Sequence, residues 1–573
     1  MGELRGGDLL VRGGTVVDGT GAPGRVADVR IRGGVIAEIG PDLTPQGEPE
    51  IDASGAVVAP GFVDAHTHFD PSLWWDPSAD PMPGHGVTTV VQGNCSLSLA
   101  PLTGDTAARD KLLDAFSYIE DMPPEAFRTG IPWNWTTWAE YRDRFDALGS
   151  AVHVAALVGH STLRAYAMGE AADQRAATAD ERAALAAALQ ECLAAGAFGL
   201  STSFVDSDRA GNPVASRYAD DEEFAALAQA LHAAGRTVFE FVPHMPLADK
   251  LADIERIHRA CAGTAVRGSW TQLGAGGRSA ADVPVILEQA GRTQAEGAGV
   301  FPQVSARSFD IQINFDRTIV FNAMPHWNAW VQVDRDEKLR CLADPAWRDK
   351  ARAEWDEVPY ALFPKGRMHK LRAVRVSDPA LERYVGCFFD EILADHPGEH
   401  EADVFMRWLA DNKVDLGLAV IGLGNDDPDA VAELLRDPRV VVGASDAGAH
   451  VQMMCGAGDS TLLLTRHVRE RGDLTIEEAV QALTSRPAEI FGIRDRGILA
   501  PGYAGDLAVF ALDELTYELD YFVDDMPDGS ARLTRPHGNY RATVAAGVPT
   551  HLAGSPTGAR PCGMLDASAA APR

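Results

Sequence analysis

Short apolar segments alternate with helical segments through the middle of this chain, and that alternation most restricts its fold. Residues 151–159 form a continuous apolar run, which is typical of a parallel strand buried on both faces. A capping box at Thr178 and Glu181 opens the next helix. Strand–helix repetition predicts a parallel α/β architecture, and over about 400 residues a (β/α)8 barrel is the leading candidate. Further strands are expected at residues 197–203, 237–242, 266–273 and 440–445, and further helices at residues 220–234 and 429–436.

The two ends of the chain show short alternating strands instead. Residues 8–19 predict two strands around the turn Gly13-Gly14, and residues 26–40 predict a hairpin around a second Gly-Gly pair. Strand signals return near residues 506–511 and 540–547. Each end resembles a half-sheet without a partner, so we expect the two to pair. The predicted domains are a β-sandwich from residues 1–58 and 491–573, and a barrel from residues 59–490 with an insertion at about 310–400.

The predicted insertion interrupts the strand–helix rhythm and is rich in Trp, Arg, Pro and Asp. Trp and Phe residues gather at 309–330. Two interpretations stay open for this cluster: an aromatic lid over the barrel mouth, or the packing of an inserted helix.

Composition and charge exclude several classes of partner. The 573 residues include 51 Lys and Arg against 82 Asp and Glu, for a formal charge of −31. Such a charge disfavours binding to nucleic acid or to anionic membranes. The seven Cys are irregularly spaced and form no CxxC, so no disulfide framework is expected. The N-terminal segment lacks an apolar signal region, and no run of about 18 apolar residues occurs. We therefore expect a soluble cytoplasmic protein.

The strongest local chemical signal is a His-x-His motif. His66 and His68 end the short apolar strand that follows Pro60-Gly61. Residues i and i+2 of a strand point to the same face. Two imidazoles on one face near the mouth of a barrel suit a divalent metal.

Several segments together resemble the amidohydrolase superfamily, and within it the D-aminoacylase (N-acyl-D-amino-acid deacylase) branch. The Gly-Asn-Cys segment at residues 93–95, after the second barrel strand, is the most specific of them. Other matching segments are residues 60–70, 159–164, 199–203, 443–450, 484–492 and 497–510. The resemblance covers both ends well and the middle poorly. It implies a metal-dependent (β/α)8 barrel beside a small β-sandwich formed by both chain ends, and hydrolysis of a carbon–nitrogen bond, usually an amide.

The implied chemistry assigns roles to particular residues. It needs a metal that polarises the carbonyl and activates a water, and a carboxylate that carries a proton to the leaving amine. Asp446 follows an apolar strand and fits that carboxylate, as catalytic residue and metal ligand. Many superfamily members bridge two metals with a carboxylated Lys on the fourth strand, but this chain has no Lys between Lys111 and Lys250. The D-aminoacylase branch uses a Cys instead, and Cys95 stands in that position; a buried structural Cys is the alternative.

The chain departs from the family pattern on the fifth and sixth strands, where relatives place metal-binding His residues. Glu240 lies within one residue of the fifth-strand position and could supply an oxygen ligand, and His244 lies a few residues later. On the sixth strand, Gln272 is a poor replacement for His. We favour one tightly bound Zn²⁺ held by His66, His68 and Asp446, completed by Cys95 or Glu240. A second, weaker site at Cys95 and Glu240 is the alternative, and Fe²⁺ or Mn²⁺ could replace zinc.

A second departure concerns the substrate. Relatives hold the substrate carboxylate with basic residues, one of them shortly after the catalytic Asp, but residues 451–460 contain no Arg or Lys. The substrate therefore either lacks that carboxylate or meets Arg164 or Arg307 from another loop. His160, just past the third strand, and His450, four residues after Asp446, are candidates for contact with the substrate or with the ligands.

These observations lead to one main hypothesis and two alternatives. The main hypothesis is a metal-dependent amidohydrolase acting on a small-molecule N-acyl or amide compound. The first alternative is a cyclic-amide hydrolase of the hydantoin or lactam type, which the same site could support. The second is a barrel that has lost its metal ligands and acts as a binding or partner subunit. The sequence leaves open a homo-oligomer.

Overall fold

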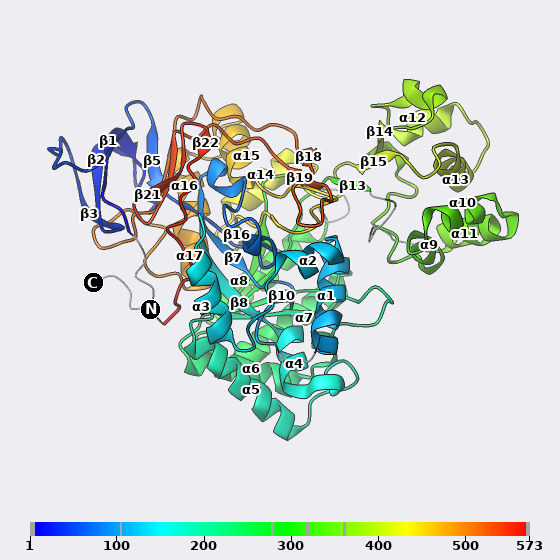
Figure 1. The fold of residues 1–573 in the computed structure, drawn as a ribbon, viewed down its shortest axis with the longest axis horizontal. Helices are drawn as coiled ribbons and strands as arrows, with labels where there is room; N and C mark the ends of the chain where they lie inside the picture. The colour runs from blue at the N-terminus through cyan, green and yellow to red at the C-terminus, as the bar shows by residue number, and fades with distance from the viewer. Residues whose placement is uncertain are drawn as a thin grey trace.

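Eight parallel strands form a barrel at the centre of the computed structural model (Figure 1). The structure describes residues 6–102, 106–276, 280–313, 315, 318, 320–358 and 362–568. The first and last strands approach each other: the N–H of Ala65 donates to the carbonyl of Gly443 at 2.7 Å, and Thr67 bridges Ala447 in parallel. The predicted (β/α)8 fold is confirmed. In chain order the strands are β6 (Phe62–Asp64), β7 (Val87–Gln92), β8 (His153–Gly159), β9 (Gly199–Ser203), β10 (Val238–Val242), β11 (Arg267–Trp270), β12 (Val300–Val304) and β16 (Val441–Val442).

Helices connect these strands and pack on their outer face (Figure 1). Thr178 and Glu181 form the predicted capping box at the start of the helix α5. Asp220 and Asp427 cap α6 and α14 by accepting hydrogen bonds from backbone N–H groups, which fixes where each helix begins. The helices beside the barrel are α1 (Thr106–Ile119), α2 (Pro124–Gly130), α3 (Trp138–Leu148), α4 (His160–Met168), α5 (Ala179–Ala194), α6 (Asp221–Ala233), α7 (Leu247–Cys261), α8 (Val283–Ala295), α14 (Pro428–Arg436), α15 (Asp459–Leu462), α16 (Ile476–Leu483) and α17 (Ser485–Phe491).

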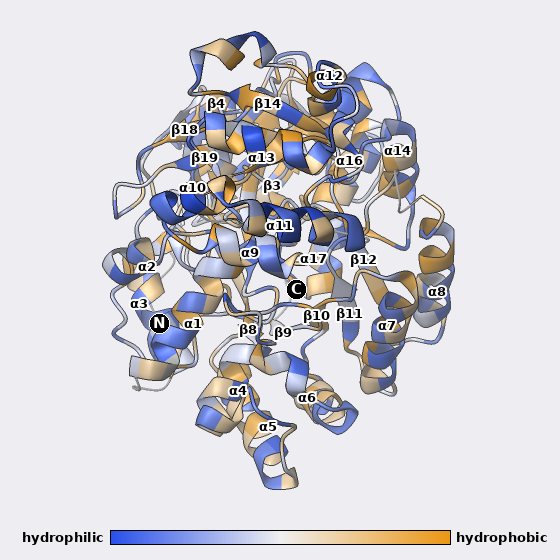
Figure 2. Cartoon of the chain, turned by 90° about the vertical axis from the view of Figure 1, so that its right-hand side faces the viewer, coloured by the Kyte–Doolittle hydropathy of each residue, from blue (hydrophilic) through white to orange (hydrophobic). Residues whose placement is uncertain are grey.

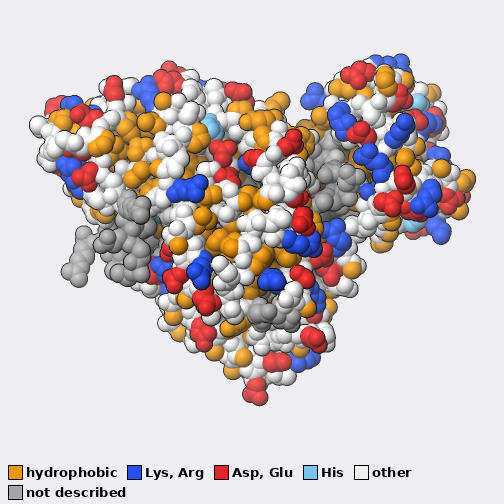
Figure 3. Space-filling view, viewed as in Figure 1, with side chains coloured by type: hydrophobic (Ala, Val, Ile, Leu, Met, Phe, Trp, Pro, Cys, Tyr) orange, Lys and Arg blue, Asp and Glu red, His pale blue; other side chains and the backbone are white. Residues whose placement is uncertain are grey.

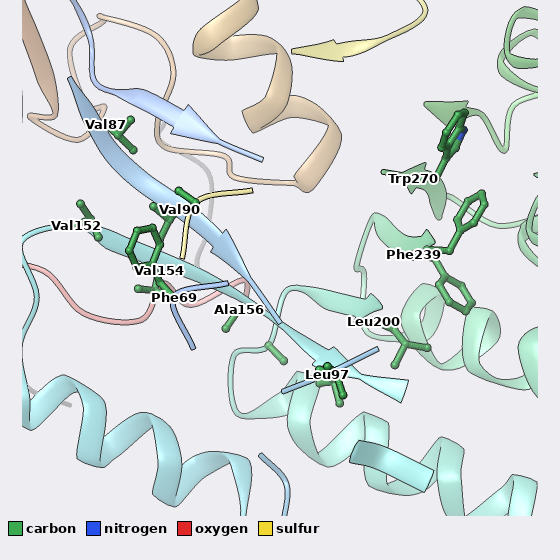
Figure 4. Close-up of a cluster of buried hydrophobic side chains, with 14 of the residues drawn as sticks. Phe69, Val87, Val90, Leu97, Val152, Val154, Ala156, Leu200, Phe239 and Trp270 are labelled. Carbon is green, nitrogen blue, oxygen red and sulfur yellow. The ribbon is translucent and has the colours of Figure 1, made fainter. Parts of the chain in front are cut away.

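Apolar side chains from consecutive strands pack together under the helices. Val90, Val154, Leu200 and Phe239 come from β7, β8, β9 and β10 and belong to one buried cluster (Figure 4). All seven residues of β8 are buried, as its continuous apolar run predicts. The packed strands hold the loops at their carboxyl ends in place, and those loops carry the polar residues of the site.

Both ends of the chain contribute to one nine-stranded sheet. Strand β5 (Val57–Pro60) pairs parallel to β1 (Leu9–Val16) and antiparallel to β17 (Leu507–Phe510), so the two ends meet at β5. The predicted turn at Gly13-Gly14 is wrong. These glycines lie inside β1, where the register against β2 (Arg25–Arg32) shifts between Val11 and Gly14, and the φ of +73° at Gly13 suits a bulge. The other strands are β3 (Val35–Gly40), β4 (Glu50–Asp52), β20 (Ala542–Ala545), β21 (Val548–Leu552) and β22 (Ser555–Pro556).

Between β12 and α14 the chain builds a lobe that projects from the barrel (Figure 1). Trp327, Trp330 and Phe405 lie in its own apolar core, which favours the packing interpretation of the aromatic cluster. In Figure 2, which looks onto the lobe, the visible side of α11 is largely hydrophilic. Met453 and Met454 join this core from the loop after Asp446. The lobe comprises α9 (Pro325–Val331), α10 (Arg335–Ala343), α11 (Pro345–Glu357), α12 (Phe389–Ala394), α13 (Glu401–Asp411) and the three-stranded sheet of β13 (Ile311–Ile313), β14 (Leu371–Arg375) and β15 (Gly417–Val420).

Acidic and basic side chains are interspersed over the face drawn in Figure 3. Near this face, a short hairpin of β18 (Tyr521–Val523) and β19 (Arg532–Thr534) joins the loop after Asp446, because the N–H of Leu533 donates to the carbonyl of Val451 at 2.7 Å.

Among the described residues, every helix is too short or too polar to cross a membrane.

Candidate metal centre

His66, His68 and Cys95 converge at the carboxyl ends of β6 and β7. The two His Nε2 atoms lie 3.2 Å apart, and Cys95 Sγ lies 3.5 Å from the first and 3.7 Å from the second. Asp446 reaches the same point from the loop after β16, with Oδ1 3.4 Å from His68 Nε2 and 3.9 Å from His66 Nε2. Cys95 and Asp446 both have positive φ angles, 54° and 59°. Such strained backbone is concentrated at functional sites, where surrounding contacts hold it.

Three of these donors, the two imidazole nitrogens and the thiol sulfur, have the separations that one zinc ion requires. With Zn–N near 2.0–2.1 Å and Zn–S near 2.3 Å, a tetrahedral ion separates two nitrogens by about 3.3 Å and a nitrogen from a sulfur by about 3.5 Å. The observed separations of 3.2, 3.5 and 3.7 Å agree with these values. Two imidazoles, a thiol and a carboxylate are also a donor set that suits zinc. The residues present therefore fit one divalent ion.

Two side chains from β10 and β12 contact the far side of His66. Gln303 Oε1 lies 2.8 Å from His66 Nδ1, and the Gln303 amide donates to Ser269 Oγ at 3.0 Å. Since an amide oxygen only accepts, it favours a proton on Nδ1 and leaves the lone pair of Nε2 directed at the other donors. Glu240 Oε2 accepts a hydrogen bond from the N–H of Cys95 at 3.1 Å, while Oε1 lies 3.7 Å from His66 Nδ1 without a hydrogen bond. Glu240 therefore lies next to Cys95 and His66, on the side of His66 that faces away from the other donor atoms.

Glu120 makes the corresponding contact with His68, and sequence reasoning missed it. Its Oε1 lies 3.1 Å from His68 Nδ1, and its buried Oε2 has no hydrogen-bond partner among the described residues. Glu120 directly follows α1 in a loop with no motif to mark it. Gln303 was also missed, although a polar residue within the buried strand β12 was a usable signal.

The charge states of the metal-free centre follow from its burial. Burial raises the pKa values of Glu120 and Glu240 to about 8, raises that of the Cys95 thiol, and lowers that of His66 to about 3. Burial opposes ionisation of Asp446 too, but the hydrogen bond and charge of His68 hold its pKa below the ordinary value. A divalent ion reverses this balance for acidic ligands because it stabilises their deprotonated forms. Metal binding here is therefore coupled to proton release.

A cation and an imidazole lie on the wall of the site next to Asp446. His450 Nε2 is 3.9 Å from Asp446 Oδ2, and its buried Nδ1 has no hydrogen-bond partner in the described part of the chain. Arg307 lies after β12 and donates from Nη2 to the carbonyl of Ser445 at 3.0 Å, while no described residue accepts from its buried Nε. The backbone N–H groups of Ala306 and Arg307 are held by the carboxylate of Asp459.

The other predicted residues lie outside this cluster. His160 begins α4, with Nε2 2.7 Å from Glu223 Oε1, and Arg164 pairs with the same buried carboxylate. His244 Nδ1 lies 2.8 Å from Asp253 Oδ2, and the His244 side chain is 39% exposed. Gln272 points its amide at the carbonyl of Ala444, at 3.4 Å. These contacts favour structural roles for His160 and Arg164.

A family model and several known proteins match this chain over most of its length. The family model described as "Amidohydrolase family" matches residues 49–551. D-aminoacylase of Alcaligenes xylosoxydans xylosoxydans is 31% identical over 526 residues, covering 89% of this chain and 90% of that protein. A structure from a study of the binuclear metal centre in D-aminoacylase has 26% identity and a TM-score of 0.64, covering 98% of this chain and 100% of the other.

A second solved structure has the same coverage of both chains. It is N-acyl-D-glutamate deacylase from Bordetella bronchiseptica, complexed with zinc and a phosphonate inhibitor, with 26% identity and a TM-score of 0.65. The chain belongs to the amidohydrolase family and is a metal-dependent hydrolase of carbon–nitrogen bonds other than peptide bonds.

Proposed function

We propose that this chain removes the acyl group from an N-acyl-D-amino acid at a centre holding one tightly bound zinc ion. The observation that carries the proposal is the set of donor atoms on His66, His68 and Cys95 at separations suited to zinc, with Asp446 Oδ1 3.4 Å from His68 Nε2. A second, weaker ion at Cys95 and Glu240 is the alternative arrangement. Small N-acyl amino acids are proposed because two proteins similar over most of the chain are a D-aminoacylase and an N-acyl-D-glutamate deacylase. The cytoplasmic location and the homo-oligomer stay predictions.

The side chains around the centre would have different roles in amide hydrolysis. A divalent ion supplies Lewis-acid chemistry and makes water a better nucleophile near neutral pH. Asp446, as an ionised carboxylate beside the ligands, would accept a proton from the attacking water. It then donates that proton to the departing amine nitrogen. Gln303 and Glu120 hold the two imidazoles in orientation through their Nδ1 atoms.

Arg307 is the residue we propose for binding the substrate carboxylate. Among the residues on this wall it is the buried cation next to Asp446, and its Nε has no partner in the described structure. A guanidinium holds a carboxylate with two parallel hydrogen bonds. Arg307 would thus replace the basic residue that is missing from residues 451–460.

The test is turnover by the zinc-loaded chain with N-acetyl-D- and N-acetyl-L-amino acids, measured as release of free amino acid by mass spectrometry. Asp446→Asn should abolish release at saturating zinc, with bound zinc measured in the same samples. Asp429→Asn, at a carboxylate 85% exposed, should leave release unchanged. An enzyme carrying zinc that leaves all these amides intact, or an Asp446→Asn variant with zinc and full turnover, would contradict the proposal.

Arg307→Met tests the carboxylate site separately. Loss of charged hydrogen bonds worth about 1.5–3 kcal/mol should raise KM roughly 10- to 150-fold for an N-acetyl-D-amino acid. KM for the corresponding amino acid amide, which lacks the carboxylate, should change little. Equal changes for both substrates would remove Arg307 from carboxylate recognition.

A further inference from the structure

A polar cavity of about 410 Å³ lies at the end of the barrel opposite the metal centre. Its walls come from the first residues of β11 and β12, from the end of α8 and from the short helix α17. The catalytic loops of such a barrel are at the carboxyl ends of the strands. A molecule in this cavity would therefore be separated from His66 and Asp446 by the packed barrel core.

Arginine side chains lie in the wall of the cavity and next to it. Arg267 and Arg486 line it, and Arg439 adjoins it through the loop that contains Pro438. Arg439 is already paired with the carboxylate of Asp437, through hydrogen bonds of 2.8 and 2.5 Å. Arg267 donates to the backbone carbonyl of Glu489 at 3.2 Å.

Arg486 differs from the other two because it makes no hydrogen bond or ion pair with any described residue. Burial lowers its pKa, and the more distant carboxylates of Asp437 and Glu489 oppose that change only in part. Three guanidinium groups thus meet two carboxylates around this cavity, on a protein whose formal charge is −31. The Glu489 side chain is 74% exposed, and its Oε1 lies 3.5 Å from Arg267 Nη2, so this ion pair is open to water.

Two amide side chains add hydrogen-bond acceptors. Gln294 donates from its nitrogen to the carbonyls of Val300 and Arg439, and Gln481 donates to the carbonyl of Thr20. Both Gln oxygens remain for a hydroxyl or amide donor of a ligand.

We propose that this cavity binds a small anion through its carboxylate or phosphate group, with Arg486 and Arg267 as the binding cations. The guanidinium fork matches the geometry of either group. The neighbouring Gln oxygens favour anions that also carry hydroxyl groups. The site is independent of the substrate proposed for the metal centre.

The experiment is titration calorimetry of the zinc-loaded full chain with inorganic phosphate and, separately, with citrate. Saturable binding of either probe is expected, and the stronger probe identifies the preferred group. Arg486→Gln should weaken binding roughly tenfold or more, since charged hydrogen bonds are lost. Glu489→Gln should strengthen it, because a competing carboxylate is removed. Arg494→Gln, which removes the same charge from an exposed position later in the chain, should leave it unchanged.

Phosphate and citrate can also bind zinc, so the titration is repeated on the metal-free protein. Binding that persists without metal and weakens in Arg486→Gln supports the cavity. Binding that disappears with the metal, or that is equal in Arg486→Gln and the unaltered chain, overturns the proposal. Absence of binding by both probes up to tens of millimolar overturns it as well. Circular dichroism of each variant confirms that the fold is retained.

Discussion

Replacing Glu120 by Gln should weaken zinc binding without disturbing the fold. Glu120 Oε1 lies 3.1 Å from Nδ1 of His68, a donor residue of the centre. A bound divalent ion favours the ionised form of this carboxylate, which makes the imidazole a better ligand and fixes its ring, and the neutral amide does so less well. Removing such a partner costs about 10- to 100-fold in metal affinity, which corresponds to about 1.4–2.8 kcal/mol. Because Gln has the shape of Glu, the surrounding packing can be retained.

Zinc affinity of the Glu120→Gln variant is measured by competition with a chromophoric chelator at fixed pH. Glu125→Gln is the matched control, since Glu125 is 59% exposed and its ion pair, among the residues described, is with Arg128 on α2. Kinetics at saturating zinc supply a second measurement, because a residue that only positions His68 should change zinc affinity more than kcat. A dissociation constant within twofold of the unaltered chain, in a variant with native circular dichroism, would refute this reasoning about Glu120.

The other predictions concern stability. Glu120 and Glu240 have pKa values raised to about 8 in the metal-free fold against 4.5 ordinarily, so the folded chain holds protons that the unfolded chain releases. The free energy of unfolding should therefore fall between about pH 7 and 8, by roughly 1–2 kcal/mol per pH unit, and excess zinc should remove that fall. Urea unfolding with and without metal measures this change. A rise in the free energy of unfolding over this window would contradict the assignment. His66 is neutral in both states there and contributes nothing, whereas His68, whose pKa is raised to about 10, keeps its proton in the fold and adds to the same fall. Glu223→Ala should cost about 3–5 kcal/mol in the same assay, because Arg164 is left buried without its carboxylate, yet zinc affinity of the folded chain should not change. A Glu223→Ala chain as stable as the unaltered one would show that this buried pair is dispensable.

The barrel could be predicted from the sequence because its signals are local. The buried strand β8 has a continuous apolar run, and helix α5 begins at a capping box, so a short window of residues is sufficient for each. The bulge in β1 was mistaken for a turn because a Gly-Gly pair suits both. Only the register against a neighbouring strand distinguishes them, and register is not a local property.

The site was predicted only as far as its motifs extend. His66, His68 and Cys95 lie in recognisable segments, and the structure brings them within hydrogen-bonding distance of one another. Glu120 reaches His68 from a loop more than fifty residues away in the sequence, and only the three-dimensional packing brings them together. His160 was expected at the barrel mouth because it follows β8. Helix α4 starts at that very residue, however, and directs its imidazole toward Glu223 on α6.

The nine-stranded sheet has a consequence for the order of events during synthesis. Strand β5 leaves the ribosome early, but its antiparallel partner β17 begins only at Leu507. At about 5–20 residues per second, the roughly 450 intervening residues take about 20–90 s to appear. Throughout that time one edge of β5 has unpaired backbone groups, which are a template for association with other chains. The nascent N-terminal strands are therefore where we expect a chaperone to bind, and where slower translation would most increase misassembly.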